Sequence, residues 1–199
     1  MNNSNIKDLI AKTDIYLIDQ IVKGRYQTTE TILDAGCGSG RNLHWFYHNN
    51  FKIYGIDQNE TQIEDLKKKY SKQKDHFSVS SLEKMEFKEE FFNHIICNAV
   101  LHFAKNKAHF KTMFSELLRV LKSKGSLFIR VASNIGIEDK ITPISEGVFK
   151  LPDGTTRFLL TKALFLELQN EHQFKMLEVF KTVNVNDLRS MTTLVIQKE

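Results

Sequence analysis

The chain is poor in the residues that interrupt or cross-link a fold, with two prolines, nine glycines and two cysteines among 199 residues. No low-complexity segment breaks it. Cys37 and Cys97 are far apart in sequence, which excludes a closely spaced metal or redox motif. We expect both to be small buried thiols, because a structural disulfide does not suit a reducing compartment.

Long apolar runs and a strong charge are also lacking. No apolar stretch reaches the roughly 20 residues of a membrane span, and the polar N-terminus lacks the apolar region of a secretory leader. Both observations predict a cytoplasmic protein with no membrane partner. Net charge is only +4, and lysines 67–69 fit a solvated helix face, so a nucleic-acid partner is disfavoured.

A metal site is not expected either. His44 and His48 stand four positions apart, as zinc ligands on a helix do, but Trp45 occupies the place of the glutamate in the zinc-protease motif.

The composition of the chain is 41% apolar and 26% charged residues, which is typical of a globular protein. We therefore predict a single domain over residues 1–199.

Strand-like and helix-like segments alternate through the first two thirds of the chain. Strands are expected near residues 31, 52, 76, 94 and 126, and helices near residues 41, 61 and 107. This alternation predicts a parallel sheet with right-handed crossovers.

The flanking segments break this alternation. Residues 14–23 predict an amphipathic helix within an N-terminal cap, residues 1–30, over the mouth of the site. Residues 133–157, with a Pro-Asp-Gly turn, predict a lid or hairpin insertion. A helix over 161–171 and two strands over 175–185 and 191–197 complete the chain.

The most informative segment is a glycine loop that joins the strand near residue 31 to a helix expected over 41–48. Asp34 ends the apolar run, and Gly36, Gly38 and Gly40 follow at alternate positions. Glycine lets a ligand approach the main chain closely. The G-x-G-x-x-G dinucleotide pattern fails, because its third position is Arg41, and no P-loop occurs.

The observed pattern, D-x-G-x-G-x-G, resembles the first motif of the class I S-adenosylmethionine-dependent methyltransferases. Residues 91–103 and 117–129 are similar to the fourth-strand motif and the helix-turn-strand that follows it in that family. The resemblance spans residues 32–131. It implies an α/β, Rossmann-like, seven-stranded, mostly parallel sheet with helices on both faces and an antiparallel C-terminal strand pair.

The resemblance also implies S-adenosyl-L-methionine as cofactor. Asp57, at the end of strand 52–57, would accept the ribose hydroxyls; the alternative is a helix N-cap, a role that Asn59 could also fill. Ser81 stands where the family carries an acid for the adenine amino group, with the Leu82 backbone and Glu83 as substitutes. The expected cofactor residues are Asp34, Gly36, Cys37, Gly38, Gly40, Arg41, Asn42, Asp57, Gln58, Ser81, Leu82 and Asn98.

Two residues are assigned to catalysis. His102 could remove a proton from a hydroxyl or amine acceptor, or be a packed histidine. Arg130, inside an apolar strand, needs an anionic partner, either a substrate or a structural carboxylate. Arg157 is a weaker site candidate, and Arg25 and Arg41 flank the glycine loop, where a cofactor carboxylate would lie.

The sequence therefore predicts methyl transfer to an O, N, S or chalcogen atom of a small molecule. Residues 40–42 also resemble the tellurite-resistance-type methyltransferases, which act on chalcogen oxyanions or soft nucleophiles. Two alternatives stay open: an RNA or protein methyltransferase, and a module that binds the cofactor without catalysis.

Overall fold

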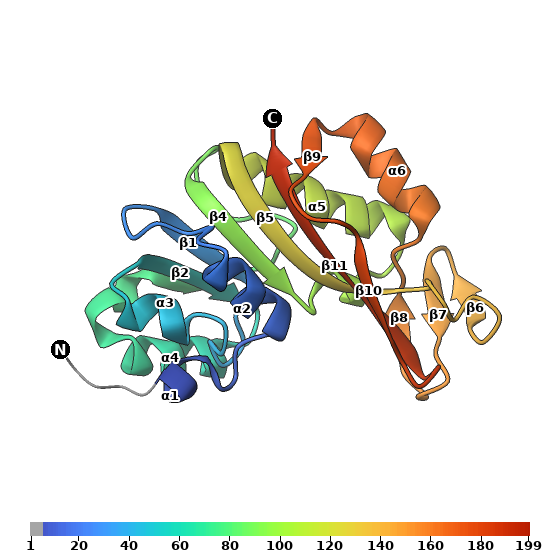
Figure 1. Cartoon of the computed structure of the whole chain (residues 1–199), viewed down its shortest axis with the longest axis horizontal. Coiled ribbons are helices and arrows are strands. Elements are labelled where there is room, and N and C mark those ends of the chain that lie inside the picture. The colour runs from blue at the N-terminus through green and yellow to red at the C-terminus, as the bar shows by residue number, and fades with distance from the viewer. Residues whose placement is uncertain (1–5) are drawn as a thin grey trace.

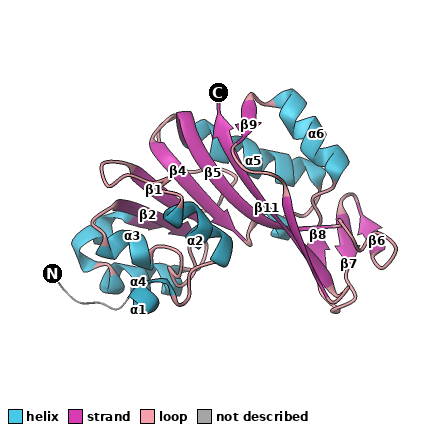
Figure 2. Cartoon of the chain, in the orientation of Figure 1, coloured by secondary structure: helices cyan, strands magenta, loops and turns pink. Residues whose placement is uncertain are grey.

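A computed structural model describes residues 6–199 and contains a mixed central sheet (Figures 1 and 2). The strands lie in the order β10-β11-β5-β4-β1-β2-β3, and β9 pairs with β11. Their bounds are β1 Thr31–Ala35, β2 Lys52–Asp57, β3 Phe77–Val79, β4 Phe92–Asn98, β5 Leu121–Ser133, β9 Phe174–Met176, β10 Lys181–Val185 and β11 Arg189–Lys198.

Strands β1 to β5 pair in parallel, whereas β11 runs antiparallel to both β5 and β10. The predicted fold class is confirmed, with β9 as an additional strand. The carboxyl ends of parallel strands share one edge of a sheet. The loops after β1, β2 and β4 therefore meet at that edge.

Strand alternation divides the core between the two faces of the sheet. Ile32, Ile96 and Phe128 pack on one face. Their neighbours Leu33, Ile95 and Ile129 pack on the other. The first face is covered by α2 Ile15–Val22, α3 His44–His48 and α4 Glu60–Lys69, and the second by α5 Lys107–Val120 and α6 Lys162–Glu171; α1 Ile6–Ile10 lies next to α3, and short 3₁₀ turns span Ser71–His76 and Leu101–Phe103.

Side-chain caps fix where four of these helices begin. Asp14, Asn59, Asn106 and Thr161 each accept a hydrogen bond from a backbone N–H in the first turn. This satisfies a donor that the helix itself leaves unpaired. The cap of α4 is thus Asn59, which leaves Asp57 for another role. No helix among residues 6–199 combines the length and apolar character needed to cross a membrane.

Two segments differ from the expected elements. The insertion at 133–157 contains a separate antiparallel sheet of β6 Thr142–Ser145, β7 Val148–Lys150 and β8 Thr156–Phe158, at one end of the molecule (Figure 1). The prediction of a single strand over residues 175–185 is wrong. The segment is divided into β9 and β10 because Glu178, between them, turns toward α2 and pairs with Lys23 and Arg25.

The helix expected over 41–48 is also shorter than predicted. Residues 41–43 form a turn, and α3 begins at His44. Within the predicted N-terminal cap, residues 1–5 lie outside the described part of the chain.

Candidate functional site

The loop after β1 needs its three glycines for different structural reasons. All have positive φ, of 83°, 48° and 68° for Gly36, Gly38 and Gly40. A Cβ on Gly36 would lie 2.4 Å from Val100 Cγ2, and one on Gly40 would lie 2.5 Å from Leu66 Cδ2. A Cβ on Gly38 would meet no heavy atom within 4 Å. Gly36 and Gly40 thus permit close packing within the protein, while Gly38 borders open space.

Asp57 holds the glycine loop against the end of β2. Its Oδ2 accepts a hydrogen bond from the Gly38 N–H at 2.8 Å, and its Oδ1 accepts one from the Asn59 N–H at 2.9 Å. The carboxylate lines a cavity of about 390 Å³, the glycine-loop cavity. This cavity is lined by Gly36, Asp57, Gln58, Ser80, Leu82, Glu83, Asn98, Ala99, Val100, Phe103, Lys105, His109 and Met113.

The segment after β3 contributes Ser80, Leu82 and Glu83 to this wall, and Ser81 is not among the lining residues. Glu83 Oε1 lies 2.6 Å from His109 Nε2, while its buried Oε2 has no hydrogen-bond partner in the described residues. Burial acts to raise the pKa of Glu83, but hydrogen bonds from its own backbone N–H and from His109 lower it overall. The structure therefore presents the charged acceptor at Glu83, the substitute considered for Ser81.

Asp34 is a buried acid without a partner. It is 1% exposed, and neither carboxyl oxygen has a hydrogen-bond partner within residues 6–199. Burial raises its pKa to about 8, although the charge of Arg41 acts in the opposite direction. An unpartnered acid behind a glycine loop fits a cationic ligand that would favour its ionised form.

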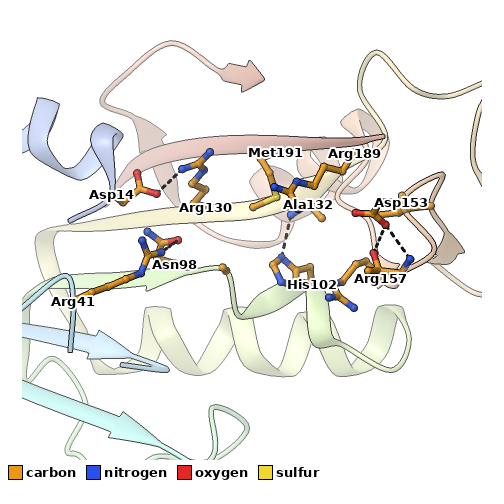
Figure 3. A pocket seen from close by; sticks show the side chains of 13 residues that line it. Asp14, Arg41, Asn98, His102, Arg130, Ala132, Asp153, Arg157, Arg189 and Met191 are labelled. Carbon is orange, nitrogen blue, oxygen red and sulfur yellow. Dashed lines mark hydrogen bonds and ion pairs between the residues drawn. The ribbon is translucent and has the colours of Figure 1, made fainter. Parts of the chain in front are cut away.

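A second cavity of about 310 Å³, the arginine-lined cavity, adjoins the first (Figure 3). Asn98 and Ala99 line both cavities. Ala99 has a φ of 63°, an uncommon value for a residue with a Cβ. The arginine-lined cavity is lined by Asp14, Arg41, Asn98, Ala99, His102, Arg130, Ala132, Leu151, Asp153, Thr155, Arg157, Arg189 and Met191.

His102 lies in this second cavity with one ring nitrogen engaged. Its Nδ1 accepts a hydrogen bond from the Ala132 N–H at 3.4 Å. Burial, and secondarily the charge of Arg157, lower its pKa to about 4. The ring is therefore neutral at pH 7, and the hydrogen bond assigns the remaining proton to Nε2. In this arrangement His102 offers a hydrogen-bond donor to the cavity rather than a free base.

Arg130 has a protein partner. Its Nη1 donates to Asp14 Oδ2 at 2.5 Å, and its guanidinium lies over the Tyr16 ring at 5.1 Å. Asp14 is buried, with a side chain 2% exposed. Of the two partners considered for this arginine, the structure shows the structural carboxylate. Arg130 still lines the arginine-lined cavity, so a contact with substrate stays a prediction.

Several predicted site residues lie behind the cavity walls. Cys37 is buried, and its burial raises the pKa of the thiol. Asn42 is also buried, and its Oδ1 accepts a hydrogen bond from the Asp14 N–H at 3.2 Å, which ties α2 to the glycine loop.

The two arginines that flank the glycine loop have different places. Arg41 lies in the arginine-lined cavity, where its Nη2 donates to Asn98 Oδ1 at 3.3 Å. Arg25 pairs with Glu178 and is not part of either wall.

Sequence reasoning missed residues on both walls. Phe103, His109 and Met113 reach the glycine-loop cavity from the 3₁₀ turn after β4 and from α5, where their helical spacing is equally typical of core residues. Asp153 and Arg189 reach the other cavity from the insertion and from the start of β11. The sequence marks Asp153 only as part of a turn, and no motif marks Arg189. No group of three or more potential metal ligands comes together in the part of the chain that the structure describes.

Comparison with known proteins agrees with the motifs. Residues 33–129 match the family described as "Methyltransferase domain". An uncharacterized methyltransferase of Bacillus subtilis strain 168, YodH, is 29% identical over 111 residues, which are 55% of this chain and 43% of that protein. The chain thus spans less than half the length of this relative.

Solved structures share the fold. A methyltransferase from Methanosarcina mazei described as SAM-dependent is 20% identical, with a TM-score of 0.72 over 89% of this chain and 96% of its own. The 1,6-didemethyltoxoflavin-N1-methyltransferase of Burkholderia thailandensis, with bound 1,6-didemethyltoxoflavin and S-adenosylhomocysteine, is 16% identical, with a TM-score of 0.71 over 98% and 81%. The family match, the sheet order and the glycine loop together identify residues 33–129 as a class I S-adenosylmethionine-dependent methyltransferase domain.

Proposed function

We propose that the protein transfers the methyl group of S-adenosylmethionine to a small-molecule acceptor bound in the arginine-lined cavity. The observation that carries this proposal is the meeting of two cavities at Asn98 and Ala99. A methyl donor in one and an acceptor in the other would come together at this wall. The volume of about 310 Å³ fits a small molecule rather than a polymer.

The residues around the glycine-loop cavity fit the cofactor. Asp57 would accept from the ribose hydroxyls, and Glu83 from the adenine amino group, since both carboxylates line the cavity. Asp34 lies behind the loop and lines neither cavity, and the cofactor's ammonium group would favour the ionised form of this unpartnered acid. When bound, the cofactor supplies a sulfonium with a reactive methyl group.

The residues around the arginine-lined cavity position the acceptor. With Nδ1 occupied by the Ala132 N–H, His102 can donate from Nε2 and so orient an acceptor oxygen or nitrogen. This favours an acceptor that is already nucleophilic over one that needs a base to remove its proton. The insertion at 133–157 closes one side of the cavity through Leu151, Asp153 and Thr155, which helps to exclude water.

The test is a transfer assay with isotopically labelled S-adenosylmethionine and a panel of thiols, chalcogen oxyanions, small acids and bulk RNA. We expect label in at least one small acceptor and none in RNA. Label in RNA alone would favour the macromolecular alternative. Binding of S-adenosylhomocysteine with no transfer to any class would favour a non-catalytic module.

Replacing Asp57 is expected to weaken cofactor binding directly. Asp57→Ala should cost about 1–3 kcal/mol of binding free energy, because ribose hydroxyls lose a charged acceptor. Calorimetric titration with S-adenosylhomocysteine measures this. Asp57→Asn is the variant matched to Asp57→Ala. It keeps an acceptor oxygen for the Gly38 N–H but removes the charge, so it separates loss of the loop contact from loss of the charge. Unchanged affinity in both variants would exclude Asp57 from the site.

Cofactor affinity is expected to depend on pH through Asp34. In the free protein its pKa of about 8 leaves the acid protonated at pH 7. The ammonium group favours the ionised form, so binding releases a proton, and affinity falls as pH is lowered below about 8. Calorimetry in buffers of different ionisation enthalpy counts that proton. Asp34→Asn should abolish this part of the pH dependence; an identical profile in both proteins would contradict the assignment.

A further inference from the structure

The arginine-lined cavity carries a net positive charge. Its walls contain four arginines, Arg41, Arg130, Arg157 and Arg189, and two acids, Asp14 and Asp153. His102 adds no charge at pH 7, because its pKa is about 4. Four positive and two negative charges leave an excess of two positive charges around the space where the acceptor is proposed to bind.

Three of these arginines, Arg41, Arg157 and Arg189, have no carboxylate partner within the described chain, and Arg41 contacts Asn98 instead. The ion pairs that arginines form among residues 6–199 involve Arg25, Arg119 and Arg130. Arg157 instead donates to the Thr156 carbonyl and lies 5.0 Å from the centre of the Phe103 ring. Arg189 is exposed at the mouth of the cavity. Both guanidinium groups thus retain donors for a ligand.

Asp153 does not neutralise this pair. Its Oδ1 accepts from the Thr155 N–H at 2.9 Å and from the Thr155 hydroxyl at 2.6 Å, which orders the turn before β8. Burial acts to raise the pKa of Asp153, but the Thr155 hydrogen bonds and the charges of Arg189 and Arg157 lower it overall. It is therefore ionised, and two cations beside one anion still leave a positive end of the cavity.

This positive end is distinct from the end near the glycine loop. Figure 3 shows Arg41 and Asn98 at one side of the cavity and Arg157, Asp153 and Arg189 at the other, with His102 between. Arg41 follows the glycine loop, where the cofactor's carboxylate is expected to lie. Arg157 and Arg189 come from β8 and β11 and lie away from that loop.

We propose that Arg157 and Arg189 bind an acidic group of the methyl acceptor, so that the substrate is a small acid with a carboxylate or phosphate group. This inference rests on the proposed function. The planar guanidinium fork matches either oxyanion through paired hydrogen bonds. A neutral analogue would leave two like charges facing the ligand without compensation, so the pair would also discriminate against uncharged acceptors.

The test uses the protein saturated with S-adenosylhomocysteine, so that the cofactor's own carboxylate site is filled. Malonate and inorganic phosphate are titrated at constant ionic strength, with malonamide as the neutral analogue, and binding is followed by calorimetry and melting temperature. We expect saturable binding of at least one anion and none of malonamide. A response to malonate alone, or to phosphate alone, identifies which acid the site prefers.

Three variants locate the binding. Arg157→Gln and Arg189→Gln should each weaken anion binding by about tenfold, the loss expected for one charged hydrogen-bond donor. The double variant should show no saturable binding. Lys150→Gln is the matched control, because Lys150 is an exposed cation on β7 of the same insertion and does not line the cavity. It should bind the anion as the parent protein does.

Failure of this inference and failure of the proposed function give different results. If S-adenosylhomocysteine binds but neither anion does, or if the double variant binds them unchanged, the assignment of Arg157 and Arg189 is overturned while the cofactor site stands. Loss of anion binding in Arg41→Gln alone would place the anion at the cofactor end and also overturn it. If S-adenosylhomocysteine itself does not bind, the proposed function fails, and the same titrations on the free protein still decide the anion site.

Discussion

Replacing Gly38 with leucine is expected to reduce binding of S-adenosylmethionine below detection in a protein that remains folded. A Cβ at Gly38 meets no protein atom within 4 Å, so a larger side chain would extend from the loop into the space proposed for the cofactor. Calorimetry with S-adenosylhomocysteine and a thermal melt on the same sample measure the two quantities. Full affinity in this variant would show that the cofactor does not approach the loop at Gly38.

The control for this prediction is Gly24→Leu. Gly24 also has a positive φ, of 68°, and open space around its Cβ position, but it lies in an exposed turn after α2. Both variants force leucine into the left-handed region at a cost of about 1–2 kcal/mol. Gly24→Leu should therefore lose similar stability and keep full cofactor affinity.

Replacing Arg130 is expected to destabilise the fold. Arg130→Met leaves the Asp14 carboxylate, 2% exposed, without its cation. Loss of one partner of a buried pair costs about 3 kcal/mol, which chemical denaturation would detect. The N-terminal helix α2 should loosen first, because Asp14 is also its N-cap. Unchanged stability would show that the pair adds nothing to folding.

A second substitution separates the structural role of Arg130 from a role in catalysis. Asp14→Asn keeps an oxygen for the N-cap hydrogen bond from Tyr16 but removes the buried charge. The double variant Asp14→Asn, Arg130→Met should regain much of the lost stability. Because Asp14 also lines the cavity, methyl transfer by the double variant is compared with that by Asp14→Asn alone, and the difference reports on Arg130 itself. KM and kcat equal to those of Asp14→Asn would remove Arg130 from the catalytic residues, and a KM above that of Asp14→Asn would keep it.

The parts of the site that sequence predicts well are local in the chain. The glycine loop is adjacent to β1, and Asp57 ends β2, so strand order alone brings them to one edge of the sheet. The choice between Asp57 and Asn59 as helix cap needed the structure, because both are acceptors that come just before the helix in the sequence. Asn59 caps α4, and Asp57 holds the loop.

The parts that sequence does not predict depend on distant contacts or irregular backbone. Arg130 and Asp14 are separated by 116 positions, and no pattern links them. Ser81 lies beyond the end of β3 at Val79, where strand alternation no longer determines which way a side chain points. The tautomer of His102 depends on the backbone N–H of Ala132, a contact that only the packed sheet creates.

The two cavities draw on different parts of the chain, and this has a practical consequence for redesign. Every residue that lines the glycine-loop cavity falls within residues 33–129, whereas Leu151, Asp153, Thr155, Arg157 and Arg189 lie outside that range. A graft that exchanges strands β6 to β8 with their turns, residues 142–158, and the first residues of β11 would therefore alter the acceptor end and leave the cofactor end intact. Such chimeras would turn this chain into a scaffold on which acceptor preference is varied one short segment at a time.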